Sequence, residues 1–206
     1  MDTRHDIGSL AALEALYGKA NPNSLAKETA RLTPAYRRWL EGAPFLAIAT
    51  SGPGGLDCSP RGDAGGRLVA VLDEATIAIP DRRGNNRLDT LRNIVADPRV
   101  GLLFLMPGVN ETLRINGRAR ITTDPELIAR FAVGDKAPAT VIVVGIETVY
   151  FQCSRALLRA RIWEVDARRD AGSVPTPGQM LRDALGTFEA EAFDADLSSR
   201  LPNQLY

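Results

Sequence analysis

The chain has 206 residues, of which 45% are hydrophobic, and its 25 basic side chains balance 25 acidic ones. This length and composition suit one globular domain, or one domain with an arm, and exclude a disordered chain. The zero net charge excludes a general nucleic-acid surface, which needs a basic excess, so any anion site must be local.

Helical periodicity occupies the start of the chain, over residues 8–41. The stretch NPNS, residues 21–24, interrupts the pattern. Thr33 followed by Pro34 is typical of an N-cap and the first position of a second helix. We therefore expect residues 1–42 to form an N-terminal helical arm.

From residue 45 the period changes to that of strands. FLAIATSGPGGLDCS predicts two strands joined by a Gly/Pro turn, and RLVAVLDEATIAIP repeats the scheme. A helix follows at about 86–96, which Asp97-Pro98 ends. Further strands are expected in RVGLLFLMP, TLRINGRARITT, ATVIVVGIETVYFQ and LLRARIWEVD, with a short helix in DPELIARF.

Six or seven strands with short turns indicate an antiparallel barrel rather than alternating strands and helices. We place this barrel in residues 43–166. Residues 167–206 contain a weak helical pattern near 178–191, and we expect them to form an extension that packs on the barrel.

Several kinds of site lack their usual residues. His5 is the single histidine, so a Ser-His-Asp or Cys-His nucleophile system is excluded, and zinc or haem sites lose their usual ligand. No metal is expected. The apolar runs are too short to span a bilayer, no signal-peptide pattern begins the chain, and two distant cysteines indicate free thiols in the cytoplasm. Such a chain either binds a ligand or borrows its chemistry from a cofactor.

The segment PDRRGNNRLDTLRNI, residues 80–94, is the first candidate site. Three arginines crowd the start of its predicted helix, where the macrodipole disfavours cations: Arg82, Arg83 and Arg87. Asn85 or Asn86 can cap the helix, and Gly84 lets a ligand approach the backbone. Free N–H groups and Arg87 would then form a phosphate cradle. A solvated basic loop is the alternative interpretation.

Two further polar clusters stand out. CSPRGDAGG, residues 58–66, offers a hydroxyl, a guanidinium and a carboxylate near a predicted strand end. FQCSR, residues 151–155, lies between two predicted strands. Ordinary polar turns are the alternative for both.

Together these clusters resemble the FMN-binding split-barrel superfamily of pyridoxamine 5′-phosphate oxidase, and within it a bacterial branch of FMN-dependent enzymes. The match covers about residues 25–165 and is most specific where DPRVGLLF is followed by LRINGRA. The resemblance implies a mainly β fold with flanking helices. More closely, it implies an antiparallel split β-barrel of Greek-key type, with FMN bound at the interface of a homodimer.

The resemblance also implies which residues touch the cofactor. They are Ser59, Arg61, Gly62, Ile79, Pro80, Asp81, Asn86, Arg87, Thr112, Gln152 and Cys153. Asn86 and Arg87 would hold the phosphate. Thr112 stands where the family has glutamine, and Gln152-Cys153 matches a Gln-Ser pair that the partner subunit contributes.

The oxidase's Arg-x-His substrate motif and C-terminal tryptophan are absent, so a vitamin B6 substrate is not expected. The sequence therefore predicts an FMN-dependent oxidoreductase of an unidentified small molecule, with neither nucleic acid nor membrane as partner. An F420-dependent reductase of the same fold and a non-catalytic flavin carrier are the alternatives.

Overall fold

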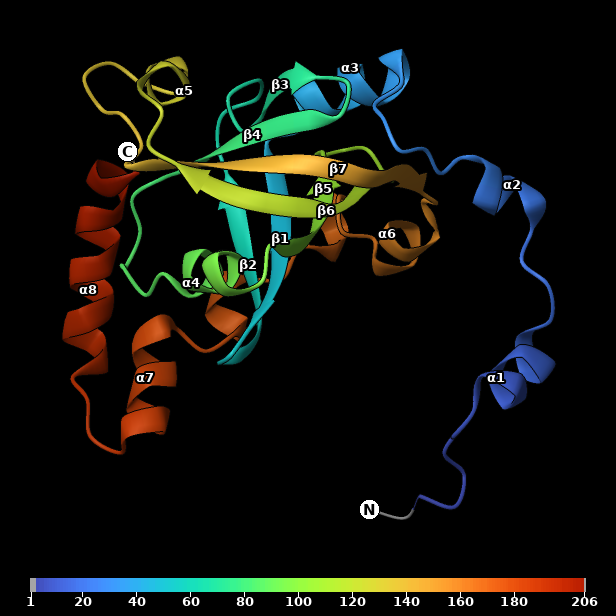
Figure 1. Ribbon diagram of the computed structural model, residues 1–206. Helices are drawn as coiled ribbons and strands as arrows, with labels where there is room; N and C mark the ends of the chain where they lie inside the picture. The colour runs from blue at the N-terminus through green and yellow to red at the C-terminus, as the bar shows by residue number, and fades with distance from the viewer. Residues whose placement is uncertain (1–2, 206) are drawn as a thin grey trace.

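The computed structural model describes residues 3–205 (Figure 1). The helices are α1 Leu10–Tyr17, α2 Pro22–Ala26, α3 Pro34–Gly42, α4 Asp89–Ala96, α5 Pro125–Arg130, α6 Arg155–Ala160, α7 Pro177–Leu185 and α8 Ala190–Arg200. The strands are β1 Phe45–Gly52, β2 Gly55–Gly62, β3 Ala70–Asp73, β4 Thr76–Asp81, β5 Arg99–Leu105, β6 Thr112–Thr122 and β7 Thr140–Gln152. Short 3-10 helices cover Val165–Ala167, Ala171–Ser173 and Leu201–Gln204.

The seven strands form one sheet in the order β2-β1-β5-β6-β7-β4-β3. Every neighbouring pair is antiparallel, and the sheet stays open between β2 and β3. Figure 1 shows α3, α4, α5 and α6 around this sheet, whereas α1 stands apart from it. The predicted mainly β fold with flanking helices is confirmed.

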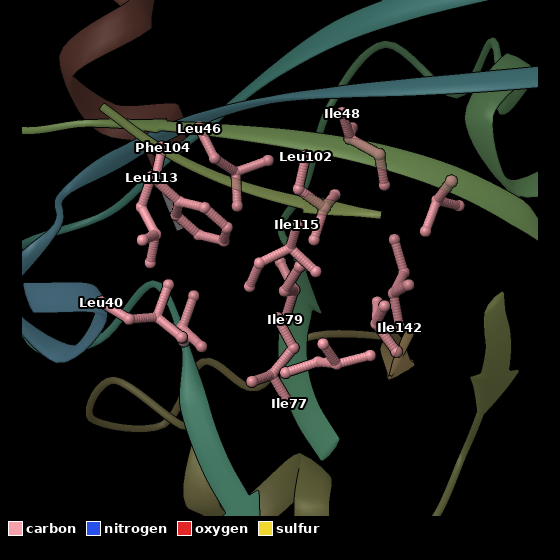
Figure 2. Close-up of a cluster of buried hydrophobic side chains, with 14 of the residues drawn as sticks. Leu40, Leu46, Ile48, Ile77, Ile79, Leu102, Phe104, Leu113, Ile115 and Ile142 are labelled. Carbon is pink, nitrogen blue, oxygen red and sulfur yellow. The ribbon is translucent and has the colours of Figure 1, made fainter. Parts of the chain in front are cut away.

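The core lies inside the curved sheet, because alternate residues of each strand point to the same side. In β1, for example, Leu46 and Ile48 are fully buried, whereas the residues between and beside them are partly exposed. Figure 2 shows these side chains meeting others from β4, β5, β6 and β7. Each buried aliphatic side chain contributes about 1.5–3 kcal/mol to the free energy of unfolding.

The N-terminal residues differ in how they join this core. Helix α1 has no buried residue. By contrast, Thr29 pairs with Val149 of β7, and Leu40 of α3 is fully buried in the core. The predicted cap of α3 is confirmed, since the Thr33 side chain accepts a hydrogen bond from the Tyr36 amide at 3.1 Å.

One prediction for the later part of the chain was wrong, and another was right about a helix but not about where it ends. The segment LLRARIWEVD was expected to be a strand, but Arg155–Ala160 is helix α6. A strand beyond Gln152 would have no neighbouring strand to pair with, because Gln152 pairs with Thr112 and β6 begins at Thr112. The segment RALLRA therefore forms a helix, in line with the high helix propensity of its alanine, leucine and arginine residues. The helix expected near 178–191 is two helices, α7 and α8, separated at Gly186, whose φ of 80° suits glycine.

Within the described part of the chain, no helix has the length and apolar character needed to cross a membrane.

Candidate functional site

A cavity of about 960 Å³ opens where the edge strand β2 approaches the end of β4. This size lies within the usual range for small-molecule sites, roughly 300–1,000 Å³. The pocket therefore bridges the two halves of the open sheet. Seven of the residues predicted to bind the cofactor line it: Ser59, Arg61, Gly62, Pro80, Asp81, Asn86 and Arg87.

Strand alternation supplies one wall of the cavity, because Asp57, Ser59 and Arg61 share a face of β2. The Ser59 hydroxyl donates to Asp57 Oδ2 at 3.0 Å. Thr90, buried in the first turn of α4, donates to the same oxygen at 2.7 Å. These bonds tie β2 to α4. Sequence analysis missed Asp57 and Thr90, although Asp57 has the two-residue spacing that places it beside Ser59.

Arg61 and Asp81 meet across the cavity wall. Arg61 Nη2 lies 3.7 Å from Asp81 Oδ1, and both side chains are only 20% exposed. Burial raises the pKa of Asp81 above its ordinary value, and the Arg61 charge opposes this rise. Arg61 Nε is buried and has no hydrogen-bond acceptor within residues 3–205. Because an unsatisfied buried donor is costly, this N–H makes the Arg61 side chain a strained part of the cavity wall.

The arginines of the loop after β4 have different surroundings. Arg82 is bound by the fold: its Nε and Nη2 lie 2.8 and 2.6 Å from Asp63 Oδ2, and its Nη1 lies 2.7 Å from the Phe131 carbonyl oxygen. Arg87 is 75% exposed and donates to Asp89 Oδ2 at 2.8 Å. Arg83 is exposed, lines the cavity, and has no ion pair in the described structure. Arg83 and Arg87 are thus the arginines of this loop that an anionic ligand can reach.

The same loop bends through two residues with left-handed backbone, Asn86 and Leu88, with φ of 59° and 62°. Such angles are strained for residues other than glycine and concentrate at functional sites. The predicted helix start was wrong: α4 begins at Asp89, and Leu88 at its N-cap offers no side-chain hydrogen bond. Asn85 instead accepts a hydrogen bond from the Arg87 amide at 3.1 Å. The first N–H groups of α4 therefore lack a side-chain cap beside the cavity.

The other predicted residues lie elsewhere. Ile79 is fully buried in the core. Gln152 pairs with Thr112 at the far end of β7. Thr140, at the near end, lines the cavity, and at about 3.3 Å per residue the strand separates it from Gln152 by roughly 40 Å. One chain therefore does not bring these groups together.

Cys153 follows Gln152 and is exposed. Its Sγ accepts a hydrogen bond from Arg155 Nε at 3.3 Å, and this bond lowers the pKa of the thiol. This contact lies at the end of β7, and neither Cys153 nor Arg155 lines the cavity.

The C-terminal segment of the chain forms part of the cavity wall, which the sequence did not predict. Leu201, Gln204 and Leu205 line it, although they follow Arg61 by some 140 residues. Figure 1 shows the end of the chain beside the start of β7. The polar and Pro/Gly-bearing character of this segment gave no signal of a contact with the site.

Residues 32–153, more than half of the chain, match the family model of pyridoxamine 5′-phosphate oxidase. The chain belongs to the pyridoxamine 5′-phosphate oxidase-like split-barrel family. This membership confirms the family and the flavin-binding fold that the sequence predicted. No curated protein matches the sequence.

Solved structures with a similar fold share little sequence with the chain. HupZ of Group A Streptococcus is 17% identical, with a TM-score of 0.48, and the match covers 58% of this chain and 94% of that one. An F420 reductase is 19% identical, with a TM-score of 0.42 and coverage of 59% and 98%. The FAD-binding protein of Mycobacterium smegmatis is 14% identical, with a TM-score of 0.42 and coverage of 60% and 97%.

Proposed function

We propose that the cavity binds FMN and that the protein is an FMN-dependent oxidoreductase acting on a small molecule. The observation that carries this proposal is a cavity of about 960 Å³ whose lining brings Arg61 together with Arg83, Arg87 and the uncapped start of α4. Membership of a family with a flavin-binding fold supports a flavin as the ligand of this cavity.

The lining suits the two ends of such a ligand. Arg83, Arg87 and the uncapped start of α4 offer donors and positive charge to a phosphate. Arg61 offers donors to the polar edge of a flat ring, and Pro80 and Leu91 offer apolar surface to its face. These features support FMN over a neutral ligand without phosphate.

When bound, the flavin supplies a two-electron carrier at its N5 atom. The residues of the chain hold and tune it. Arg61 is a fixed, mostly buried cation, and such a cation stabilises negative charge that develops nearby. Asp81 takes up a proton more readily than an exposed aspartate, because burial raises its pKa. Asp57, on the same face of β2 as Arg61, adds a second carboxylate to the cavity wall.

A second copy of the chain completes the proposed site. The outward face of β2, β1 and β5 carries small and apolar side chains that are neighbours in register: Phe45, Ala47, Ala49, Cys58, Pro60, Leu103 and Leu105. Phe45 is 39% exposed. A contiguous apolar face of this kind favours association. Two-fold pairing through it would also offer Gln152 and Cys153 of each chain to the cavity of the other, across the distance that a single chain does not close.

The test is the visible spectrum of the purified protein, followed by titration with FMN and, separately, with F420. We expect a yellow protein that binds about one FMN per chain and, by light scattering, has twice the 22.2 kDa chain mass. A protein that takes up F420 but not FMN would overturn the cofactor assignment. Stopped-flow mixing with NADH, NADPH or reduced F420 then separates enzyme from carrier, because only an enzyme should accelerate flavin reduction over free FMN.

A further inference from the structure

The segment Leu201–Leu205 lies outside residues 32–153, the part that matches the family, yet it forms one wall of the cavity. It follows helix α8 directly as a 3-10 turn. Figure 1 places this end of α8 next to the start of β7, in agreement with Thr140 lining the same cavity. This wall of the pocket therefore comes from outside the part of the chain that matches the family model.

The segment is presented by a braced helical hairpin. The Gly178 amide donates to Asp194 Oδ1 at 2.8 Å, and the Thr176 hydroxyl donates to the other oxygen of Asp194. Helices α7 and α8 also touch closely, since a Cβ added to Gly178 would lie 2.4 Å from the Ala190 carbonyl oxygen. Arg182 and Glu191 add an ion pair at 3.1 Å. This bracing fixes the direction in which α8 delivers the residues that follow it.

The chemistry of the segment suits a flat, partly polar ring. Leu201 and Leu205 are 47% and 65% exposed while lining the cavity, so their apolar surface lacks a complete partner. Gln204 is less exposed, and its Oε1 accepts a hydrogen bond from Arg200 Nη1 at 3.4 Å. This contact leaves the amide N–H groups of Gln204 to donate to a ligand. The phosphate-binding features lie instead on the loop around Arg83 and Arg87.

We infer that Leu201–Leu205 is the cover of the flavin site: Leu201 and Leu205 pack on the bound ring and exclude water, and Gln204 binds its polar edge. The inference rests on the proposed function. In this scheme Leu201, Gln204 and Leu205 contact the ring, whereas Arg83 and Arg87 bind the phosphate. The cover also slows release of the ligand, because the ring leaves only when the segment moves aside.

The test compares the full chain with Leu201→Ala/Leu205→Ala and with the control Leu185→Ala, which alters a 62% exposed leucine of α7 outside the cavity lining. FMN and riboflavin, which lacks the phosphate, are the two ligands. For the double variant we expect dissociation of both ligands to accelerate about tenfold or more, since affinity changes act mostly on release. Iodide should quench the flavin bound to this variant more strongly, and the control should behave as the unaltered chain.

A second measurement follows the segment itself. Trypsin cleavage after Arg200 removes the segment and is read as a loss of mass from the intact chain. Saturating FMN should slow this cleavage in the unaltered chain. Faster cleavage with FMN, or ligand dissociation unchanged in the double variant while FMN still binds, would overturn the cover. Failure of the full chain to bind FMN or riboflavin would instead overturn the proposed function and the inference with it.

Discussion

Asp63 and Arg82 form an ion pair that fixes the segment after β2 to the loop after β4. Arg82 Nε and Nη2 both donate to Asp63 Oδ2, at 2.8 and 2.6 Å, and the Asp63 side chain is fully buried. Arg82 also donates to the Phe131 carbonyl oxygen. The arginines of this loop thus have different roles. Arg82 stabilises the fold at the edge of the cavity, whereas Arg83 and Arg87 can bind a ligand.

Arg82→Ala should therefore destabilise the fold. Removing it breaks a buried ion pair and takes both Arg82 hydrogen bonds from the buried Asp63 carboxylate, and removing one partner of such a pair costs about 3–5 kcal/mol. Urea denaturation followed by circular dichroism measures the change. The matched control is Arg83→Ala in the same loop, which should change the unfolding free energy by less than about 0.5 kcal/mol. Equal stability of the two variants would contradict the division of roles.

Arg83→Ala and Arg87→Ala should each weaken FMN binding without harming the fold. A lost charge-assisted hydrogen bond costs about 1.5–3 kcal/mol, which is roughly a ten- to hundredfold rise in the dissociation constant. The ion pair between Arg87 and Asp89 is exposed and contributes little to stability. Titrations with FMN and riboflavin decide the point, because riboflavin affinity should stay unchanged. A parallel loss for riboflavin would show that these arginines do not bind the phosphate.

Local patterns predicted much of the fold, and their failures have physical causes. Thr33-Pro34 gave the start of α3 because capping is a local interaction. The strand expected beyond residue 154 failed, since strand formation needs a neighbour, and β6 offers none after Gln152. The helix start after Asn85 and Asn86 failed as well. There the chain adopts left-handed angles at Asn86 and Leu88 to line the cavity, against the preference of leucine.

Asp81→Asn should change the pH dependence of stability. The pKa of Asp81 is raised above 3.8 by burial, so the folded state holds this proton more tightly than the unfolded state. As pH rises from about 3.8 through the raised pKa, Asp81 ionises more easily in the unfolded state than in the folded state. The free energy of unfolding therefore falls over this pH range. Asparagine cannot ionise, so the variant should gain stability relative to the unaltered chain over this window. Urea midpoints at about pH 3 to 7 measure the difference, and a constant difference would contradict the burial effect.

Gly117→Ala should destabilise the β6–β7 ladder at its bulge. A Cβ on Gly117 would lie 2.1 Å from the Gly145 carbonyl oxygen, a backbone atom that cannot rotate away. Overpacking of this kind costs about 1–3 kcal/mol or more. The control is Gly145→Ala, whose Cβ would meet only the Arg118 carbonyl oxygen at 3.8 Å, an ordinary contact. Thermal unfolding should show a lower midpoint for the first variant alone; equal midpoints would refute the steric account.

Sequence analysis found site residues that lie close together in the chain, but not the contacts between distant segments. Resemblance to the family marked Ser59, Arg61 and Asp81, and strand alternation explains why Ser59 and Arg61 share one face of β2. No local pattern connects Asp57 with Thr90, or the cavity with Leu205, since these contacts depend on how distant segments pack. Polar residues of the loop also look alike in sequence. Only their partners distinguish Arg82 from Arg83.

Leu103→Asp tests whether two chains build the site. Leu103 lies on the outward face of β5, opposite Ala47 of β1 and Arg114 of β6, and its side chain is outside the core. A carboxylate there should leave the monomer folded but oppose burial of this face in a dimer, because an unpaired charge is costly to desolvate. We expect light scattering to report the mass of one chain, and FMN affinity to fall with the loss of the dimer.

The matched control is Leu185→Asp, on an exposed position of α7 away from this face, which should keep both the dimer and the flavin. Circular dichroism of both variants checks that the sheet is intact. The decisive comparison is between mass and affinity across a dilution series of the unaltered protein. If the site is shared, bound FMN and dimer fraction fall together on dilution. A monomer that keeps its full FMN affinity would show that each chain binds the cofactor alone, and that Gln152 and Cys153 belong to no flavin site.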